Sequence, residues 1–128
     1  EVILAAPDID ADVFRRDIAP QMVKKIAKPI TLYVSSDDLA LIASRKVHGN
    51  KRAGDAGEGV VIVKGVETID ASGVDTSFLS HSYFATTKTI IEDILDLMKS
   101  GKRAQYRQTL EKVSKENVTY WKVKQNKN

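Results

Sequence analysis

The chain has 128 residues, of which 42% are hydrophobic and 29% are charged, a balance that is ordinary for one folded domain. It contains no cysteine, which excludes disulfides, thiolate catalysis and cysteine-ligated metal centres. No apolar run approaches the roughly 20 residues that a membrane-spanning helix needs. The net charge is +3, but residues 99–128 hold nine basic and two acidic side chains, so positive charge is concentrated in the C-terminal stretch.

The N-terminal half predicts two strands separated by a helix. Residues 2–6 and 30–34 are continuous apolar or β-branched runs, which suit strands of a sheet that is covered on both faces. Asp8, Asp10 and Asp12 follow the first run. A helix is expected from about residue 12, with an aspartate as its N-cap and Val13, Ile18, Met22, Val23 and Ile26 on its inner face.

The following residues continue the alternation. We expect a helix over about residues 39–47, strands over residues 60–63 and 66–71, and a long amphipathic helix over about residues 84–98. The inner face of that last helix is expected to consist of Ile90, Ile91, Ile94, Leu95 and Met98. The order of strands and helices predicts an α/β fold in three layers, with a mostly parallel sheet between helices.

The chain is expected to divide at residue 98. Residues 1–98 would form the α/β domain, and residues 99–128 a basic C-terminal extension. Within the extension, a solvated helix is expected over about residues 104–115, followed by a short strand or a disordered end. Because the chain starts at Glu1 and enters an apolar run at once, we also expect further sequence upstream. A targeting segment would lie there, so the sequence assigns no compartment.

Candidate chemistry lies just after the predicted strands, because functional groups of parallel sheets cluster beyond the carboxyl ends of the strands. Asp37 and Asp38 follow the second strand, and His81 follows the last. A carboxylate there could fix the tautomer of the imidazole and stabilise its protonated form, so that the ring could act as a general base. The residues alone leave open that His81 is an ordinary surface residue. The Asp8 cluster is expected to shape a pocket or cap a helix.

Five sequence blocks occur in one order: AAPDIDADVF (5–14), TLYVSSDDLAL (31–41), RAGD (52–55), IDASGVD (69–75) and HSY (81–83). Together they resemble an uncharacterised α/β-hydrolase-like family, the domain of unknown function nine hundred, over about residues 2–98. The resemblance implies the C-terminal portion of an α/β-hydrolase fold, with a catalytic triad in the chain order nucleophile, acid, histidine. It assigns the acid to Asp38, with Asp37 as the second choice, and the histidine to His81.

The nucleophile of such a triad is missing from the chain. None of the nine serines lies in a Gly-x-Ser-x-Gly turn, so the nucleophile and the oxyanion hole would lie outside these residues. The sequence therefore predicts the C-terminal part of a serine hydrolase that cleaves ester or other acyl bonds of a small-molecule or acyl substrate. It indicates no metal and no cofactor, and we expect the fragment alone to be inactive.

Two other readings stay open. The first predicted strand would present an unpaired apolar edge, so the chain could be a non-catalytic interaction module that forms a homodimer through residues 2–6. Alternatively, the extension interleaves lysines and arginines with Tyr106, Tyr120 and Trp121, a pattern that can bind nucleic acid or an anionic membrane. We favour a solvated extension over this last reading.

Overall fold

The computed structural model describes residues 1–35, 39–56, 59–72 and 81–124. Within these residues, one five-stranded sheet has the strand order β1-β2-β3-β5-β4. The pairs β1–β2, β2–β3 and β3–β5 are parallel, and β4 is antiparallel to β5. The mostly parallel sheet confirms the predicted α/β fold. The strands are β1 (Val2–Ala5), β2 (Ile30–Val34), β3 (Val66–Asp70), β4 (Leu110–Lys115) and β5 (Val118–Val123).

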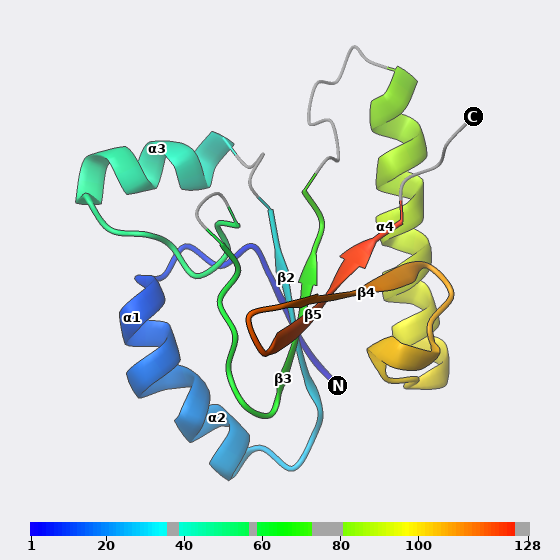
Figure 1. Ribbon diagram of the computed structural model, residues 1–128, viewed down its shortest axis with the longest axis horizontal. Helices are drawn as coiled ribbons and strands as arrows, with labels where there is room; N and C mark the ends of the chain where they lie inside the picture. Colours follow the sequence, from blue (N-terminus) through cyan, green and yellow to red (C-terminus); the bar gives the residue numbers. More distant parts are fainter. Residues whose placement is uncertain (36–38, 57–58, 73–80, 125–128) are drawn as a thin grey trace.

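Helices lie on both sides of the sheet, which gives the three predicted layers (Figure 1). The run α1–η1–α2 lies on one side and α4 on the other, while α3 lies toward the end to which β2 and β3 point. The helical elements are α1 (Ala11–Val13), the π-helical η1 (Phe14–Ile18), α2 (Ala19–Lys25), α3 (Leu39–His48), α4 (His81–Ser100) and the 3₁₀ turn η2 (Ala104–Tyr106). In the described part of the chain, no helix is both long and apolar enough to cross a membrane.

The sheet separates two apolar clusters, and β2 contributes to both. All five of its residues are buried, as its continuous apolar and β-branched run predicts. Leu32 and Val34 pack in the cluster that contains Phe14. Tyr33 packs in the opposite cluster with Ile69, between the sheet and α4. The period of two along a strand therefore divides β2 between the two layers.

The helical run 11–25 begins where the aspartates predicted it. Asp10 is the N-cap, and its Oδ1 accepts hydrogen bonds from the backbone N–H groups of Asp12 and Val13. The expected inner face is partly wrong, because Val13 and Val23 are 37% and 36% exposed. A π-helical turn, in which the N–H of Ala19 donates to the carbonyl oxygen of Phe14, changes the period of 3.6 residues on which that face was based.

The predicted long helix is confirmed as α4, but its inner face is narrower than expected. Ile90 and Ile94 pack against the sheet, and Leu97 is 1% exposed. These positions follow the i, i+4, i+7 spacing of one helix face. A second apolar stripe was also expected inside, and it is exposed instead. This stripe consists of Ile91, Leu95 and Met98, which are 50%, 46% and 67% exposed.

The strand predicted over residues 60–63 is wrong. Residues 60–63 carry no strand assignment, and they reach β3 through a turn in which the N–H of Val66 donates to the carbonyl oxygen of Val63 over 3.1 Å. Both edges of β3 are already paired, with β2 and β5. Residues 60–63 therefore cannot pair with an edge of β3. They lie across its face instead, where the Thr68 hydroxyl donates a hydrogen bond to the carbonyl oxygen of Val61.

The helix predicted over residues 104–115 is also wrong. Only Ala104–Tyr106 is helical, and β4 then pairs with β5 as a hairpin that extends the sheet beyond β3. Glu116 and Asn117 form the two-residue turn, with φ values of +49° and +68°. Two consecutive residues in the left-handed region match the twist that antiparallel strands need. The extension thus shares the sheet of the preceding residues, while the division at residue 98 stays a prediction.

A buried polar network connects α4, β2 and the extension. The carboxylate of Asp93 accepts hydrogen bonds from Tyr33 Oη at 2.6 Å, Thr109 Oγ1 at 2.5 Å, and Arg107 Nε and Nη2 at 2.8 and 3.2 Å. The side chains of Asp93 and Arg107 are fully buried. Arg107 Nη1 also donates to the carbonyl oxygen of Lys102 at 2.7 Å. Directional bonds therefore fix α4 against the sheet at one axial position.

Candidate functional site

The carboxyl ends of β1, β2 and β3 meet at one edge of the sheet. The ladder continues just past the strands, because the N–H of Ala6 donates to the carbonyl oxygen of Tyr33 at 2.8 Å and that of Ala71 to Val34 at 2.7 Å. The segments that follow the three strands therefore leave the sheet side by side. In parallel sheets this edge is the usual position of functional groups.

The predicted catalytic residues follow two of these strands. Asp37 and Asp38 lie outside the described residues, between Ser35 at the end of β2 and Leu39 at the start of α3. His81 is the first residue of α4, and its side chain is likewise outside the described part. Figure 1 shows that α4 begins at the same end of the molecule to which β2 and β3 point. The pairing of Asp38 with His81 stays a prediction.

Asp8 connects the segment after β1 to two other elements at this edge. Its Oδ1 accepts hydrogen bonds at 2.7 Å from Ser44 Oγ on α3 and from Arg52 Nε on the following loop. The Arg52 side chain is 12% exposed and also donates to the carbonyl oxygen of Asp8 at 3.3 Å. The hydrogen bond from Ser44, followed by the bond and charge of Arg52, lowers the pKa of Asp8. Asp8 is therefore ionised, and its carboxylate connects the segment after β1 to α3 and to the loop that carries Arg52.

Gly54 joins the segments that follow β1 and β2. Its N–H donates to the carbonyl oxygen of Pro7 at 2.9 Å, and its own carbonyl oxygen accepts from the N–H of Ser35 at 2.8 Å. A Cβ at this position would lie 2.3 Å from the carbonyl carbon of Ala6. Only glycine permits this approach of two backbones, which explains the glycine of the RAGD block.

Sequence reasoning missed Asp55, the last residue of the same block. Asp55 is 1% exposed, and its N–H donates to the carbonyl oxygen of Arg52 at 3.0 Å. The next residue, Ala56, donates to the carbonyl oxygen of Ser35 at 3.3 Å, which places this buried carboxylate beside the end of β2. In the sequence, Asp55 is marked only by its membership of the RAGD resemblance block.

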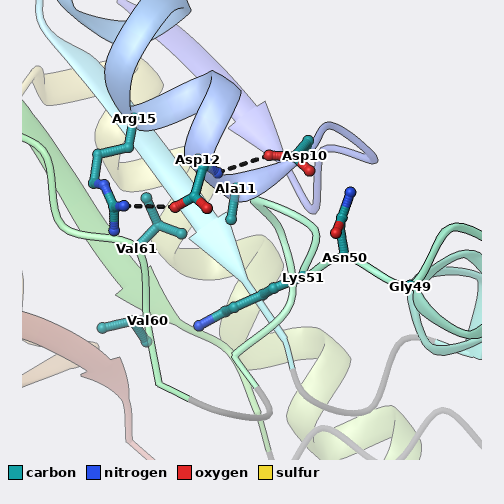
Figure 2. Close-up of a pocket in the computed structure, with 9 residues that line it drawn as sticks. All are labelled: Asp10, Ala11, Asp12, Arg15, Gly49, Asn50, Lys51, Val60 and Val61. Atoms are coloured by element: carbon teal, nitrogen blue, oxygen red, sulfur yellow. Dashed lines mark hydrogen bonds and ion pairs between the residues drawn. The ribbon is translucent and has the colours of Figure 1, made fainter.

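A small pocket of about 220 Å³ lies beside this edge, at the start of α1 (Figure 2). Its polar groups bond to one another and to the backbone. Asp12 pairs with Arg15 at 2.5 Å, and the Lys51 ammonium donates to the carbonyl oxygen of Gly59. The hydrogen bond from the N–H of Val13 lowers the pKa of Asp10. Asp10 thus caps the helix and Asp12 forms an ion pair, which suits a cluster that shapes a pocket or caps a helix.

Among the residues that the structure describes, no group of three or more histidine or acidic side chains is arranged to hold a metal ion.

The fold and the position of the site together define an α/β protein whose candidate chemistry lies beyond β2 and β3. The family model described as alpha/beta hydrolase of unknown function (DUF900) matches residues 1–99. The chain belongs to this family, and the resemblance seen in its five sequence blocks is confirmed. No curated protein and no solved structure matches the chain. The family match ends before η2 and the β4–β5 hairpin.

Proposed function

We propose that this chain forms the part of a serine hydrolase that carries the acid and the histidine of the triad. Asp38 would be the acid and His81 the histidine, and the nucleophile would lie on sequence outside these residues. One observation supports this best. Val34 and Asp70 are register partners at the ends of β2 and β3, so the segments that lead to Asp38 and His81 start from adjacent positions.

The chemistry follows from the order of the groups. In the proposed mechanism Asp38 accepts a hydrogen bond from one ring nitrogen of His81 and so fixes its tautomer. The other ring nitrogen removes the proton of the serine hydroxyl, whose oxygen attacks the acyl carbon of an ester or amide. The leaving alcohol or amine receives that proton, and an acyl-enzyme forms. Water then attacks the acyl carbon by the same route and releases the acid.

The surrounding contacts support a rigid edge for this chemistry. Gly54 connects the segments after β1 and β2 by backbone hydrogen bonds, and Asp8 ties the first of these segments to Ser44 and Arg52. Catalytic side chains must be held within about 0.5 Å of their productive geometry, which requires such support. The loops at this edge thus start from fixed points.

Two uncovered apolar surfaces support the view that more chain belongs to the catalytic unit. In the described residues, β1 pairs with β2 alone, and its residues Val2, Ile3 and Leu4 are only half-buried. The exposed stripe of α4 is the second such surface. An open strand edge and an exposed apolar helix face both favour association with further chain.

Labelling with a fluorophosphonate tests the proposal in the product of the full gene. The expected result is covalent labelling that is lost in His81→Ala and slowed about 10³- to 10⁴-fold in Asp38→Asn. His48→Ala is the matched control, because His48 is an exposed residue at the end of α3, and it should label normally. Labelling of His81→Ala at the rate of the unchanged protein would refute the triad. The 128-residue chain alone should not be labelled.

The open edge of β1 favours a second candidate, a non-catalytic module that forms a homodimer. The N–H groups of Val2 and Ala6 both donate inward, to the carbonyl oxygens of Pro29 and Tyr33. Since amides alternate along a strand, the N–H groups of Ile3 and Ala5 face the open edge. Light scattering of the 128-residue chain should then show a dimer that dissociates in Ala5→Pro, a change that spares the ladder to β2. A monomer at all concentrations contradicts this candidate.

A further inference from the structure

Residues 60–63 have the side-chain pattern of a strand but no strand partner among the residues that the structure describes. Val61 and Val63 are 4% and 9% exposed and pack in the cluster that contains Phe14. Val60 and Ile62 alternate with them and are only half-buried. Within the described part of the chain, the backbone groups of Val60 and Ile62 make no hydrogen bond. The segment therefore offers unpaired amides and carbonyls together with an outward apolar face.

Two grooves flank this segment, and Ile62 contributes to both. The first, of about 540 Å³, lies between Ile62 and Val23 of α2. The second, of about 500 Å³, lies between Ile62 and the β4–β5 hairpin, where Val118 and Tyr120 line it. Val118 is 39% exposed and Val23 is 36% exposed. The outward side of the segment is thus bordered on each side by space that apolar side chains could fill.

The rims of the grooves are basic. Lys24 and Lys64 line the first groove and Lys115 the second, and all three are exposed. No ion pair forms between any of these lysines and the rest of the described chain. One acidic residue, Glu116, lines the second groove. A partner that is acidic as well as apolar would complement this surface, because opposite potentials favour encounter and register.

We propose that residues 60–63 are a docking strand for an extended acidic peptide segment of another protein. The peptide backbone would pair with the free amides and carbonyls of Val60 and Ile62. Its apolar side chains would occupy the grooves beside Ile62, and its alternate acidic side chains would reach Lys24, Lys64 and Lys115. This site lies across the face of the sheet, and it does not depend on the proposed triad.

The test uses an acetylated and amidated heptapeptide, Glu-Val-Glu-Ile-Glu-Val-Glu, titrated into the ¹⁵N-labelled 128-residue chain. The expected result is a set of chemical-shift changes at residues 60–63, with slower amide exchange at Val60 and Ile62. Lys24→Gln combined with Lys64→Gln should weaken binding by roughly fivefold, since each exposed pair contributes a modest attraction. Lys99→Gln combined with Lys102→Gln is the matched control and should bind like the unchanged chain, because neither residue lines the grooves.

Two further peptides separate backbone pairing from charge alone. The same heptapeptide with an N-methyl group on every backbone nitrogen lacks the amides that would pair, and it should bind more weakly and protect neither Val60 nor Ile62. A peptide with lysine in place of each glutamate should not bind. Equal binding of the N-methylated peptide, or shift changes that map to the β1 edge instead, would overturn the proposal. Binding of the lysine peptide would overturn it as well.

Discussion

Replacing Arg107 with methionine should strongly destabilise the fold, because it leaves the carboxylate of Asp93 buried without its counter-ion. Both side chains are fully buried, and Arg107 donates two of the four hydrogen bonds that Asp93 receives. Removing one partner of a buried pair costs about 3–5 kcal/mol. Because the hydroxyls of Tyr33 and Thr109 still donate to Asp93, we expect the free energy of unfolding to fall by about 3 kcal/mol, the lower end of this range. For a chain of this size that corresponds to a fall in Tm of roughly 10–15 °C.

Urea unfolding of the 128-residue chain, followed by circular dichroism, measures this loss. Arg15→Met is the matched control, because the Arg15–Asp12 pair is short but its side chains are 58% and 68% exposed, and the expected cost is at most about 0.5 kcal/mol. Adding Asp93→Leu to Arg107→Met should restore part of the stability, since it removes the buried carboxylate that has lost its counter-ion. The reasoning fails if Arg107→Met unfolds within about 0.5 kcal/mol of the unchanged chain.

Three further predictions concern pH and one glycine. Burial, together with the hydrogen bond to Asp93, raises the pKa of Tyr33 above its ordinary value of 10.0. The stabilisation that Tyr33 provides is therefore present below pH 10 and falls as the pH rises further. The difference in Tm between the unchanged chain and Tyr33→Phe should accordingly shrink between about pH 10 and 11. The pKa values of Asp8 and Asp10 are held below 3.8, so the stabilisation that these carboxylates provide is present above that pH and is lost below it. When Tm is measured as the pH is lowered into this range, Asp10→Ala should lose less of its Tm than the unchanged chain does. Gly54→Ala should lower stability by about 3 kcal/mol or more in the same urea assay, because the new Cβ meets backbone atoms that cannot move aside.

The parallel half of the sheet could be predicted from the sequence because its signal is local. β1, β2 and β3 each end within one residue of the predicted run. Residues 60–63 show the same kind of apolar run, and nothing within the run reveals that β2 and β5 already occupy both edges of β3. Strand pairing is a property of the whole sheet, so a local pattern predicts a strand-like segment and not its partner.

The hairpin and the buried network were harder to predict for a different reason. The turn Glu116–Asn117 lacks the glycine that usually marks a two-residue hairpin, and polar or charged residues interrupt the apolar residues of both strands without a regular period. Asp93 and Arg107 are charged residues, which are rarely buried unless paired, and a pairing across 14 residues leaves no periodic trace. In the candidate site, the sequence marked the RAGD block by resemblance, but its role became visible only with the contact of Gly54 on Ala6.

The same network connects the extension to the candidate site. α4 is one continuous helix from His81 to Ser100, and the bonds to Asp93 fix its axial position, since a slip of one residue would move it by about 1.5 Å and turn it by about 100°. Two of the donors, Arg107 and Thr109, lie beyond the last residue of the family match. Apolar packing of Ile90 and Ile94 would tolerate small shifts that these directional bonds do not. In the proposed mechanism the extension is therefore part of the framework that sets the axial position of α4, and with it the position of the backbone of His81 at its start.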